Sequence, residues 1–351
     1  MAVDPEDQVV RHADIDGATV AWSSIGSGPP LVVGGWWSSH LGLDWEDAGF
    51  RRFIGRLAEH RSVIRYDRPG SGASDRDAPL PTDAEQEYAV LTGVLDATGS
   101  DSFALLGASS GCTVASALAA RQPERIEALI LYGGYVRGTD IAPPSAQEAM
   151  LSIVERHWGL GSRVLADVFL PGADAAERER FAVFQRRSAS RDVAAASLRS
   201  AYSFDSSAHL AEVQVPTLVL HRRDDRAIPF ALGRDLADHI DGARFVALEG
   251  VDHFPWRGDS DGVADEIIRF LGGDVPERVG ATRPSASDVR LSARELEILS
   301  LVARGHTDAQ IARDLILSAH TVHRHVANIR TKLGVPTRAA AAAWAKDQHV
   351  I

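Results

Sequence analysis

Short apolar runs alternate with longer amphipathic stretches over residues 1–273 of the chain. The runs LVV, FALL and TLVL contain no polar alternation, as expected for strands that are buried on both faces of a sheet. Stretches with helical spacing lie between such runs, at residues 84–98, 112–121 and 230–240. This order predicts an α/β domain with a doubly wound, mostly parallel sheet. We expect its strands at residues 18–23, 31–33, 62–66, 103–106, 128–132, 217–221 and 244–248.

Residues 137–211 interrupt this alternation. They show several helix-like stretches in succession, with turn signals at Pro143-Pro144 and Pro171-Gly172. Because the insertion follows a central strand, we expect it to form a helical cap over the C-terminal edge of the sheet. The first domain then closes with a helix at 263–271 and spans residues 1–273.

A linker and a small helical domain are expected after this point. Residues 274–288 are rich in Pro, Gly, Ser and charge, which is typical of an interdomain linker. In the tail, residues 289–351, Ser292 and Glu295 have the spacing of a capping box, and Thr307 and Ser318 precede the next two helices. A fourth helix is expected at 337–347. Two short helices joined by a tight turn predict a helix-turn-helix within an all-α four-helix domain.

The two predicted domains differ in charge. The whole chain carries a formal net charge of −11. Residues 288–351 hold nine Lys and Arg against six Asp and Glu, a net +3, which leaves −14 for residues 1–287. DNA repels an acidic body, whereas a basic tail gains free energy by displacing counterions from phosphates. The asymmetry therefore favours DNA binding by the tail.

Composition excludes several other classes of protein. A single cysteine rules out an intrachain disulfide and is typical of a reducing cytoplasm. No run approaches the ~20 apolar residues of a membrane span, and the start of the chain does not resemble a signal peptide. The sequence has no zinc-ligand spacing, so we expect no metal and no cofactor. These observations predict a cytoplasmic protein that does not bind membranes.

The string Gly107-Ala108-Ser109-Ser110-Gly111 follows a buried strand and begins a helix. Small residues at its ends let the chain turn sharply and expose the Ser109 hydroxyl above the sheet. The N-terminus of the helix directs partial positive charge toward a developing oxyanion. Because a serine hydroxyl is a poor nucleophile until a base takes its proton, this candidate needs partners elsewhere in the chain.

Candidate partners follow the last two expected strands. Asp224 and Asp225 come after the strand at 217–221, and Asp252 and His253 come after the strand at 244–248. His253 is the candidate base, and a carboxylate is needed to orient it. Asp252 adjoins His253 but points elsewhere if the backbone is extended there, which disfavours it as that carboxylate.

The order Ser, Asp, His, with each residue on a loop after a strand, resembles that of the α/β-hydrolase family. Residues 66–74, YDRPGSGAS, also resemble the family's turn after its fourth strand. The resemblance covers about residues 15–273. It implies a triad of Ser109, Asp225 and His253, because Asp225 has the family spacing of Asp, three residues and Pro.

The same resemblance implies an oxyanion hole made by two backbone N–H groups, those of Ser110 and Trp36. The loop that contains Trp36 departs from the family, which more often has His-Gly or Pro-Gly where this chain has Gly34-Gly35. Ser109 occupies the position at which an Asp would have indicated epoxide or haloalkane chemistry.

Aromatic residues are concentrated in the loops expected around this site. Ordinary core packing is one explanation for them, and an apolar binding cleft is the other. On the second interpretation the ligand is a small apolar ester, lactone or related compound. The candidate pocket residues are Gly35, Trp37, Phe254 and Trp256.

The third helix of the tail has one apolar stripe, formed by Val322, Val326, Ile329 and Leu333 at helical spacing. Its opposite face carries small groups, hydrogen-bonding groups and cations but no carboxylate, which suits the major groove of double-stranded DNA. The candidate DNA-binding residues on and beside that face are His320, Thr321, Arg324, Asn328, Thr331 and Lys332.

The strings LSARELEIL, DAQIARDL and TVHRHVANIRTKLGV together closely resemble the LuxR-type helix-turn-helix. The resemblance covers the whole tail and implies DNA binding as a homodimer on a two-fold site. One departure is His323, where the family often has Lys or Arg.

Three functions remain open from the sequence. The first is a transcriptional regulator whose hydrolase-fold domain senses and hydrolyses its ligand. The second is a serine hydrolase, an esterase or lactonase, whose tail serves localisation or dimerisation. The third is a receptor on a hydrolase fold that does not turn its ligand over. Fold alone does not decide among them, because function depends on the site.

Overall fold

A computed structural model describes residues 7–34, 36–275, 293–315, 317–318, 321–322, 325–326, 329 and 338–347. The chain divides into two compact units, Met1–Val275 and Pro276–Ile351. Apart from residues 274 and 275, the predicted linker at 274–288 lies outside the described residues.

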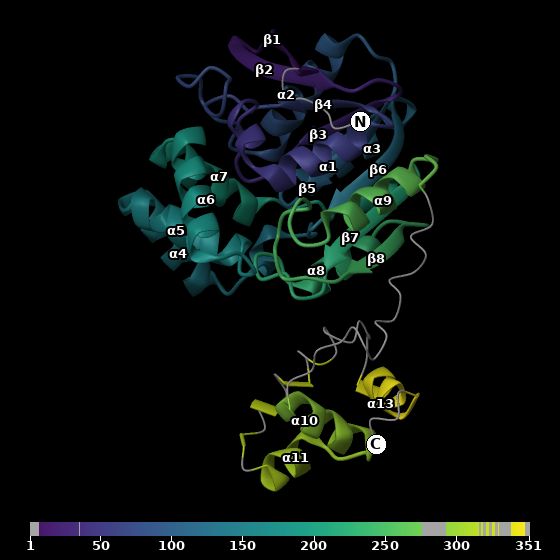
Figure 1. The fold of residues 1–351 in the computed structure, drawn as a ribbon. Helices are drawn as coiled ribbons and strands as arrows, with labels where there is room; N and C mark the ends of the chain where they lie inside the picture. The colour runs from purple at the N-terminus through teal and green to yellow at the C-terminus, as the bar shows by residue number, and fades with distance from the viewer. Residues whose placement is uncertain are drawn as a thin grey trace. The chain divides into compact units, whose positions relative to one another are not determined.

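The first unit is built on one eight-stranded sheet with the order β1-β2-β4-β3-β5-β6-β7-β8 (Figure 1). β1 and β2 pair antiparallel, as do β2 and β4, and the other neighbours pair parallel. The strands are β1 (Val9–Ile15), β2 (Ala18–Ile25), β3 (Pro30–Gly34), β4 (Ser62–Tyr66), β5 (Phe103–Ala108), β6 (Ile126–Tyr132), β7 (Thr217–Arg222) and β8 (Arg244–Leu248).

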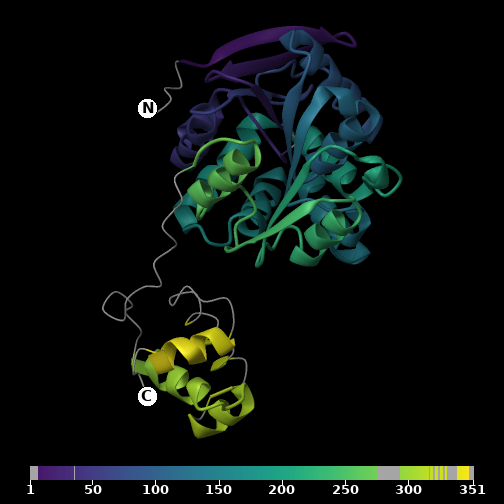
Figure 2. The same cartoon turned by 90° about the vertical axis from the view of Figure 1, so that its right-hand side faces the viewer.

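Helices cover both faces of this sheet (Figure 2). Helix α1 packs against α9, and α2 packs against α3. Their bounds are α1 (Ala48–Ala58), α2 (Ala84–Thr98), α3 (Gly111–Arg121), α8 (Phe230–Asp238) and α9 (Ser260–Phe270). The central strand β5 is buried along its whole length between these layers, as its unbroken apolar sequence predicts.

Two elements were not expected from the sequence. β1 is an edge strand whose first four residues are exposed, so its sequence lacks an apolar run. Helix α1 contains Gly49 and Gly55, which lower helix propensity. Asp47 caps α1 by accepting from the N–H groups of Gly49 and Phe50, and the helix buries Phe50 and Phe53.

The segment between β6 and β7 forms four helices, which lie together at the left of Figure 1. They are α4 (Pro144–Arg156), α5 (Trp158–Phe169), α6 (Ala175–Ser188) and α7 (Arg191–Ser203), and α5 packs against both α4 and α6. We call these four helices the cap. They fall within the residues, 137–211, for which the sequence predicted a helical insertion.

The described part of the second unit contains α10 (Ala293–Ala303), α11 (Asp308–Asp314) and α13 (Arg338–Asp347). Val322, Val326 and Ile329 are buried in the core of this unit, as the predicted stripe requires, whereas Leu333 lies outside the described residues. No helix in the described ranges of either unit is long and apolar enough to cross a membrane.

Two caps that the sequence predicted in this unit are present. Thr307 accepts from the N–H of Gln310, whose side chain accepts in return from the Thr307 N–H. Ser318 Oγ accepts from the N–H of Thr321 at 3.0 Å. The first predicted cap residue, Ser292, lies outside the described residues.

We expect Thr307→Ala to destabilise α11, because the substitution removes the side-chain oxygen that accepts from the Gln310 N–H. An N-cap of this kind contributes about 1 kcal/mol, so amide hydrogen exchange in residues 308–314 should accelerate about fivefold. Thr307→Ser keeps the oxygen and serves as the control. Unchanged exchange in the alanine variant would contradict the role of the cap.

Candidate active site

Ser109 lies at a sharp turn between β5 and α3. It has φ +56°, a left-handed conformation that is costly for a residue with a side chain. A Cβ on Gly107 would lie 2.7 Å from the Ala115 Cβ, so the turn requires glycine there. The Ser109 N–H donates to the carbonyl of Tyr132 at 2.9 Å, which anchors the turn to β6. The half-buried side chain of Ser109 is thus presented at the C-terminal edge of the sheet.

Asp225 and His253 are both buried and joined by a hydrogen bond of 2.8 Å between Oδ2 and Nδ1. The other carboxylate oxygen of Asp225 accepts from the N–H groups of Ala227 at 2.8 Å and Ile228 at 3.2 Å. Burial would raise the pKa of Asp225, but the charge and hydrogen bond of His253 outweigh it and the pKa is lowered. Because the ionised carboxylate can only accept, Nδ1 of His253 carries the proton of this hydrogen bond, and we expect Nε2 to act as the base.

The pairing of the strands brings this pair toward Ser109. Ala108 of β5 lies opposite Tyr132 of β6, so the next residue on each strand, Ser109 and Gly133, leaves the sheet side by side. A Cβ on Gly133 would lie 3.1 Å from Cε1 of His253 and 3.8 Å from Oδ2 of Asp225. The imidazole therefore lies over Gly133, the residue that leaves β6 where Ser109 leaves β5. Contact between Ser109 and His253 stays a prediction.

The other two acidic candidates lie elsewhere. Asp224 is exposed, and its N–H donates to the carbonyl of Gly250. The carboxylate of Asp252 accepts from the N–H of Gly172 at 2.8 Å, in the segment between α5 and α6 of the cap. Of the three, Asp225 is thus the one hydrogen-bonded to His253.

A second histidine lies beside Asp225. Nε2 of His221 is 3.7 Å from the Asp225 carboxylate and 2.9 Å from the carbonyl of Ile228. Burial lowers the pKa of His221, and the hydrogen bond of its ring to Ile228 links the end of β7 to the loop that carries Asp225. This role could not be predicted from the sequence, because it depends on the return of the chain after β7.

The two predicted oxyanion donors follow different strands, Ser110 after β5 and Trp36 after β3. Ser110 is the N-cap of α3 and its side chain makes no capping hydrogen bond. Gly34 of β3 pairs with Gly107 of β5, so Trp36 and Ser109 each lie two residues beyond paired positions at the same edge. Backbone N–H groups at such an edge can bind the negative charge of a tetrahedral intermediate.

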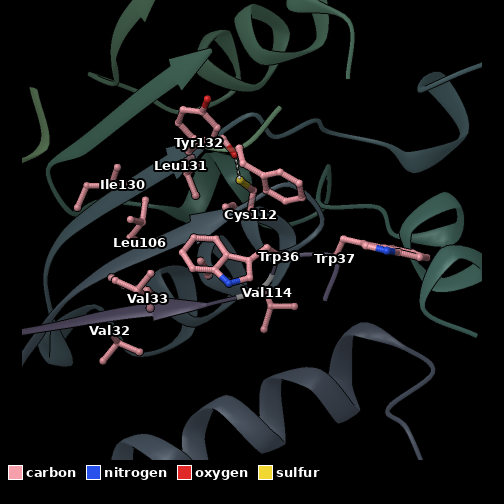
Figure 3. Close-up of a cluster of buried hydrophobic side chains, with 14 of the residues drawn as sticks. Val32, Val33, Trp36, Trp37, Leu106, Cys112, Val114, Ile130, Leu131 and Tyr132 are labelled. Carbon is pink, nitrogen blue, oxygen red and sulfur yellow. Dashed lines mark hydrogen bonds between the residues drawn. The ribbon is translucent and has the colours of Figure 1, made fainter. Parts of the chain in front are cut away.

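The predicted pocket residues are packed among other aromatic rings. Nε1 of Trp37 donates to Gln185 of α6 at 2.9 Å, so its ring turns away from Trp36 toward the cap (Figure 3). Phe254 and Trp256 stack with ring centroids 4.7 Å apart. Gly35 lies outside the described residues.

Cys112 is buried among the apolar side chains drawn in Figure 3, and its N–H donates to the carbonyl of Ser109 at 3.1 Å. Its Sγ lies 3.4 Å from the carbonyl of Gly107, and burial raises the pKa of the thiol well above its usual range. Such a thiol is unreactive, which leaves Ser109 as the nucleophile candidate. The described ranges bring no three His, Cys, Asp or Glu side chains together as metal ligands.

A cavity of about 20 Å³ lies beside the turn, with Gly34, Arg68, Ser110 and Phe204 in its wall. This volume holds roughly one water molecule. Arg68 spans it, pairing with Glu87 and donating to the carbonyl of Trp37 and the hydroxyl of Ser197 in the cap.

A model of the alpha/beta hydrolase family matches residues 31–266. The chain belongs to the alpha/beta hydrolase family. Its strand order and its turn at Ser109 are those of an alpha/beta hydrolase, with the cap inserted between β6 and β7.

Several hydrolases are similar to this alpha/beta hydrolase. A 2-hydroxy-6-oxononadienedioate/2-hydroxy-6-oxononatrienedioate hydrolase of Paraburkholderia phymatum is 28% identical over 257 residues, which are 70% of this chain and 85% of that protein. The crystal structure of an enol-lactonase from Burkholderia xenovorans matches with 26% identity and a TM-score of 0.63, covering 75% of this chain and all of that one.

A polyketide synthase, ThaQ of Burkholderia thailandensis, is 30% identical over 255 residues. That alignment covers 70% of this chain but only 12% of the synthase. An esterase from Exiguobacterium antarcticum, 20% identical with a TM-score of 0.66, shares the fold; it covers 76% of this chain and 100% of its own.

Residues 289–345 match a model of the luxR family of bacterial regulatory proteins. This alpha/beta hydrolase thus carries a LuxR-type DNA-binding domain. Of the predicted DNA-binding residues, Thr321 is described, at the start of a helix that Ser318 caps. The others, His320, Arg324, Asn328, Thr331 and Lys332, lie outside the described residues.

We expect Gly133→Ala to slow the reaction of Ser109 with a fluorophosphonate by an order of magnitude or more, because the added methyl group would displace the His253 ring. Gly99→Ala is the matched control. Gly99 also has a positive φ, +71°, but a Cβ there meets nothing within 4 Å. Equal labelling of both variants would show that Gly133 does not limit the position of the ring.

Proposed function

We propose that this protein is a transcriptional regulator whose hydrolase domain binds and hydrolyses a small apolar ester or lactone at Ser109. One observation carries the proposal. The strained Ser109 turn leaves the sheet beside Gly133, and over Gly133 lies a histidine whose Nδ1 is bonded to a buried carboxylate. Strain of this kind costs free energy and persists where function requires it.

In the proposed reaction, Nε2 of His253 takes the hydroxyl proton as Ser109 Oγ attacks the substrate carbonyl. The N–H groups of Ser110 and Trp36 bind the oxyanion, and Asp225 stabilises the imidazolium. The protonated histidine then gives its proton to the leaving alkoxide, and an acyl group remains on Ser109. Water, deprotonated by the same histidine, releases the acid and restores the serine.

The surroundings of His253 favour an apolar substrate. Phe169 of α5 stacks on the imidazole with ring centroids 5.5 Å apart, and Phe254 lies 5.8 Å away on the adjoining residue. Phe181 of α6 packs on both phenylalanines. A lactone also agrees with the relationship to an enol-lactonase.

Carbon–carbon bond hydrolysis by the same residues is a second candidate. It is favoured by the 28% identity to a hydrolase named for 2-hydroxy-6-oxo dienedioates. Parallel assays with lactones, small esters and a 2-hydroxy-6-oxo dienoate would separate the two reactions. If only the dienoate is turned over, the substrate class is the 2-hydroxy-6-oxo dienoates and not the esters or lactones.

The cap provides a route from ligand binding to regulation. The N–H of His253 donates to the carbonyl of Phe169 at 2.8 Å, so the end of α5 touches both the backbone and the ring of His253. A ligand that displaces α5 would therefore also move His253. The cap would then have two positions, and the ligand would bind the protein more tightly in one of them. We propose that this change alters the DNA affinity of a cytoplasmic homodimer.

We expect one fluorophosphonate adduct on the wild-type protein by intact mass and none on Ser109→Ala. Asp225→Asn should react slowly, since loss of the orienting carboxylate costs about 10⁴ in comparable triads. Ser110→Ala should react normally, because it keeps the backbone N–H. A folded wild-type protein that forms no adduct would favour the receptor without turnover.

We expect the full-length protein to bind DNA with an affinity that falls steeply as salt rises. Arg324→Ala should weaken binding and change its sequence preference, since this position lies on the predicted groove-facing side of the third helix. Ser110→Ala, in the other unit, is the control. Unaltered binding by the Arg324 variant would contradict the predicted DNA-reading face.

A further inference from the structure

Arg222, the last residue of β7, is one of the most deeply buried side chains of the protein. Only 2% of its surface is exposed, and it is among the largest side chains that solvent does not reach. Arginine is rarely buried to this degree unless its charge is matched by hydrogen-bond acceptors. The identity of those acceptors therefore indicates what the residue does.

In the described part of the chain, the acceptors of the Arg222 guanidinium are all main-chain carbonyls of one loop. Nη1 donates to the carbonyls of Asp252 at 2.8 Å and Phe254 at 2.9 Å. Nη2 donates to the carbonyls of Pro255 at 3.5 Å and of Arg257. The residue between the first two acceptors is His253, so a single nitrogen holds the backbone on both sides of the proposed base.

The loop is shaped to surround this guanidinium. Gly250 has φ +121°, and a Cβ there would lie 3.2 Å from Cδ of Arg222. Gly258 has φ +57°, and its Cβ would lie 3.9 Å from the guanidinium carbon. From the other side, that carbon lies 6.0 Å from the centroid of the Tyr132 ring. Arg222 thus occupies the centre of the turn that carries His253.

A planar guanidinium suits this arrangement better than an ammonium would. Its N–H groups diverge in a fixed fork, so one side chain can serve several carbonyls that converge from different directions. Asp225 follows Arg222 by three residues on the same loop. The strand end that supplies the orienting carboxylate therefore also supplies the group that holds the histidine loop.

We propose that Arg222 is a positioning residue of the hydrolase, which holds the backbone around His253 so that the imidazole stays between Asp225 and Ser109. This inference rests on the proposed function of Ser109. A purely structural arginine would affect stability alone, whereas a positioning arginine also affects the state of the imidazole and the reactivity of the serine.

The test compares Arg222→Met with Arg61→Met. Arg61 is also buried and also donates to a main-chain carbonyl, that of Leu271, but it contacts Glu127 rather than the histidine loop. We expect Arg222→Met to react with a fluorophosphonate about 10²-fold more slowly than the wild type, and Arg61→Met to react at the wild-type rate. The downfield proton resonance of the hydrogen bond between His253 and Asp225 should broaden or shift in Arg222→Met alone.

Two further variants keep the test decisive if Arg222→Met folds poorly. Arg222→Lys retains the charge without the fork, so we expect labelling between the rates of the wild type and Arg222→Met. Arg222→Gly leaves space for a guanidinium ion, and added ethylguanidinium should restore part of its labelling rate. Wild-type rates in folded Arg222→Met, or absence of rescue together with an unchanged resonance, would overturn the positioning role.

Failure of the proposed function would look different. If the wild-type protein forms no adduct, the nucleophilic role of Ser109 is wrong. The resonance of the histidine then still reports on Arg222, because it needs no substrate. An unchanged resonance in Arg222→Met would overturn the positioning role in that case too.

Discussion

The parallel pairing of β3, β5 and β6 is the constraint on which the candidate site depends. It places Gly34, Gly107 and Leu131 at the same level, so the loops after three strands emerge together at one edge. Ser109 lies two residues after Gly107, and Gly133 lies two residues after Leu131. A slip of one residue in either pairing would turn every side chain of the strand to the opposite face and separate the serine from the histidine.

Buried charge is the second requirement of the site. The Asp225 carboxylate is stabilised by two backbone N–H groups and by His253, and the Arg222 guanidinium by carbonyls of the histidine loop. Each group would be costly to bury without these partners. The same hydrogen bonds that offset this cost fix the two loops in position, so the stability of the edge and the geometry of the site have a common origin.

Much of the first unit could be predicted from the sequence, because strands buried on both faces leave continuous apolar runs. The strand β1 and the helix α1 were not predicted, because the first four residues of β1 are exposed and α1 contains two glycines. Asp225 was preferred to Asp224 only through the family spacing. Arg222 gave no signal at all, since a charged residue at the end of a strand is expected in solvent, and its acceptors lie 30 to 35 residues further along the chain.

The proposed regulator requires that occupancy of its hydrolase site changes its affinity for DNA. The most direct measurement is the dissociation constant for a DNA fragment selected with the full-length protein, before and after stoichiometric labelling of Ser109 with a fluorophosphonate. Ser109→Ala treated with the same reagent is the control. We expect a change of about 5- to 150-fold on labelling, the usual range of coupling between two sites, and none in the control. Equal affinity of labelled and unlabelled protein would contradict it.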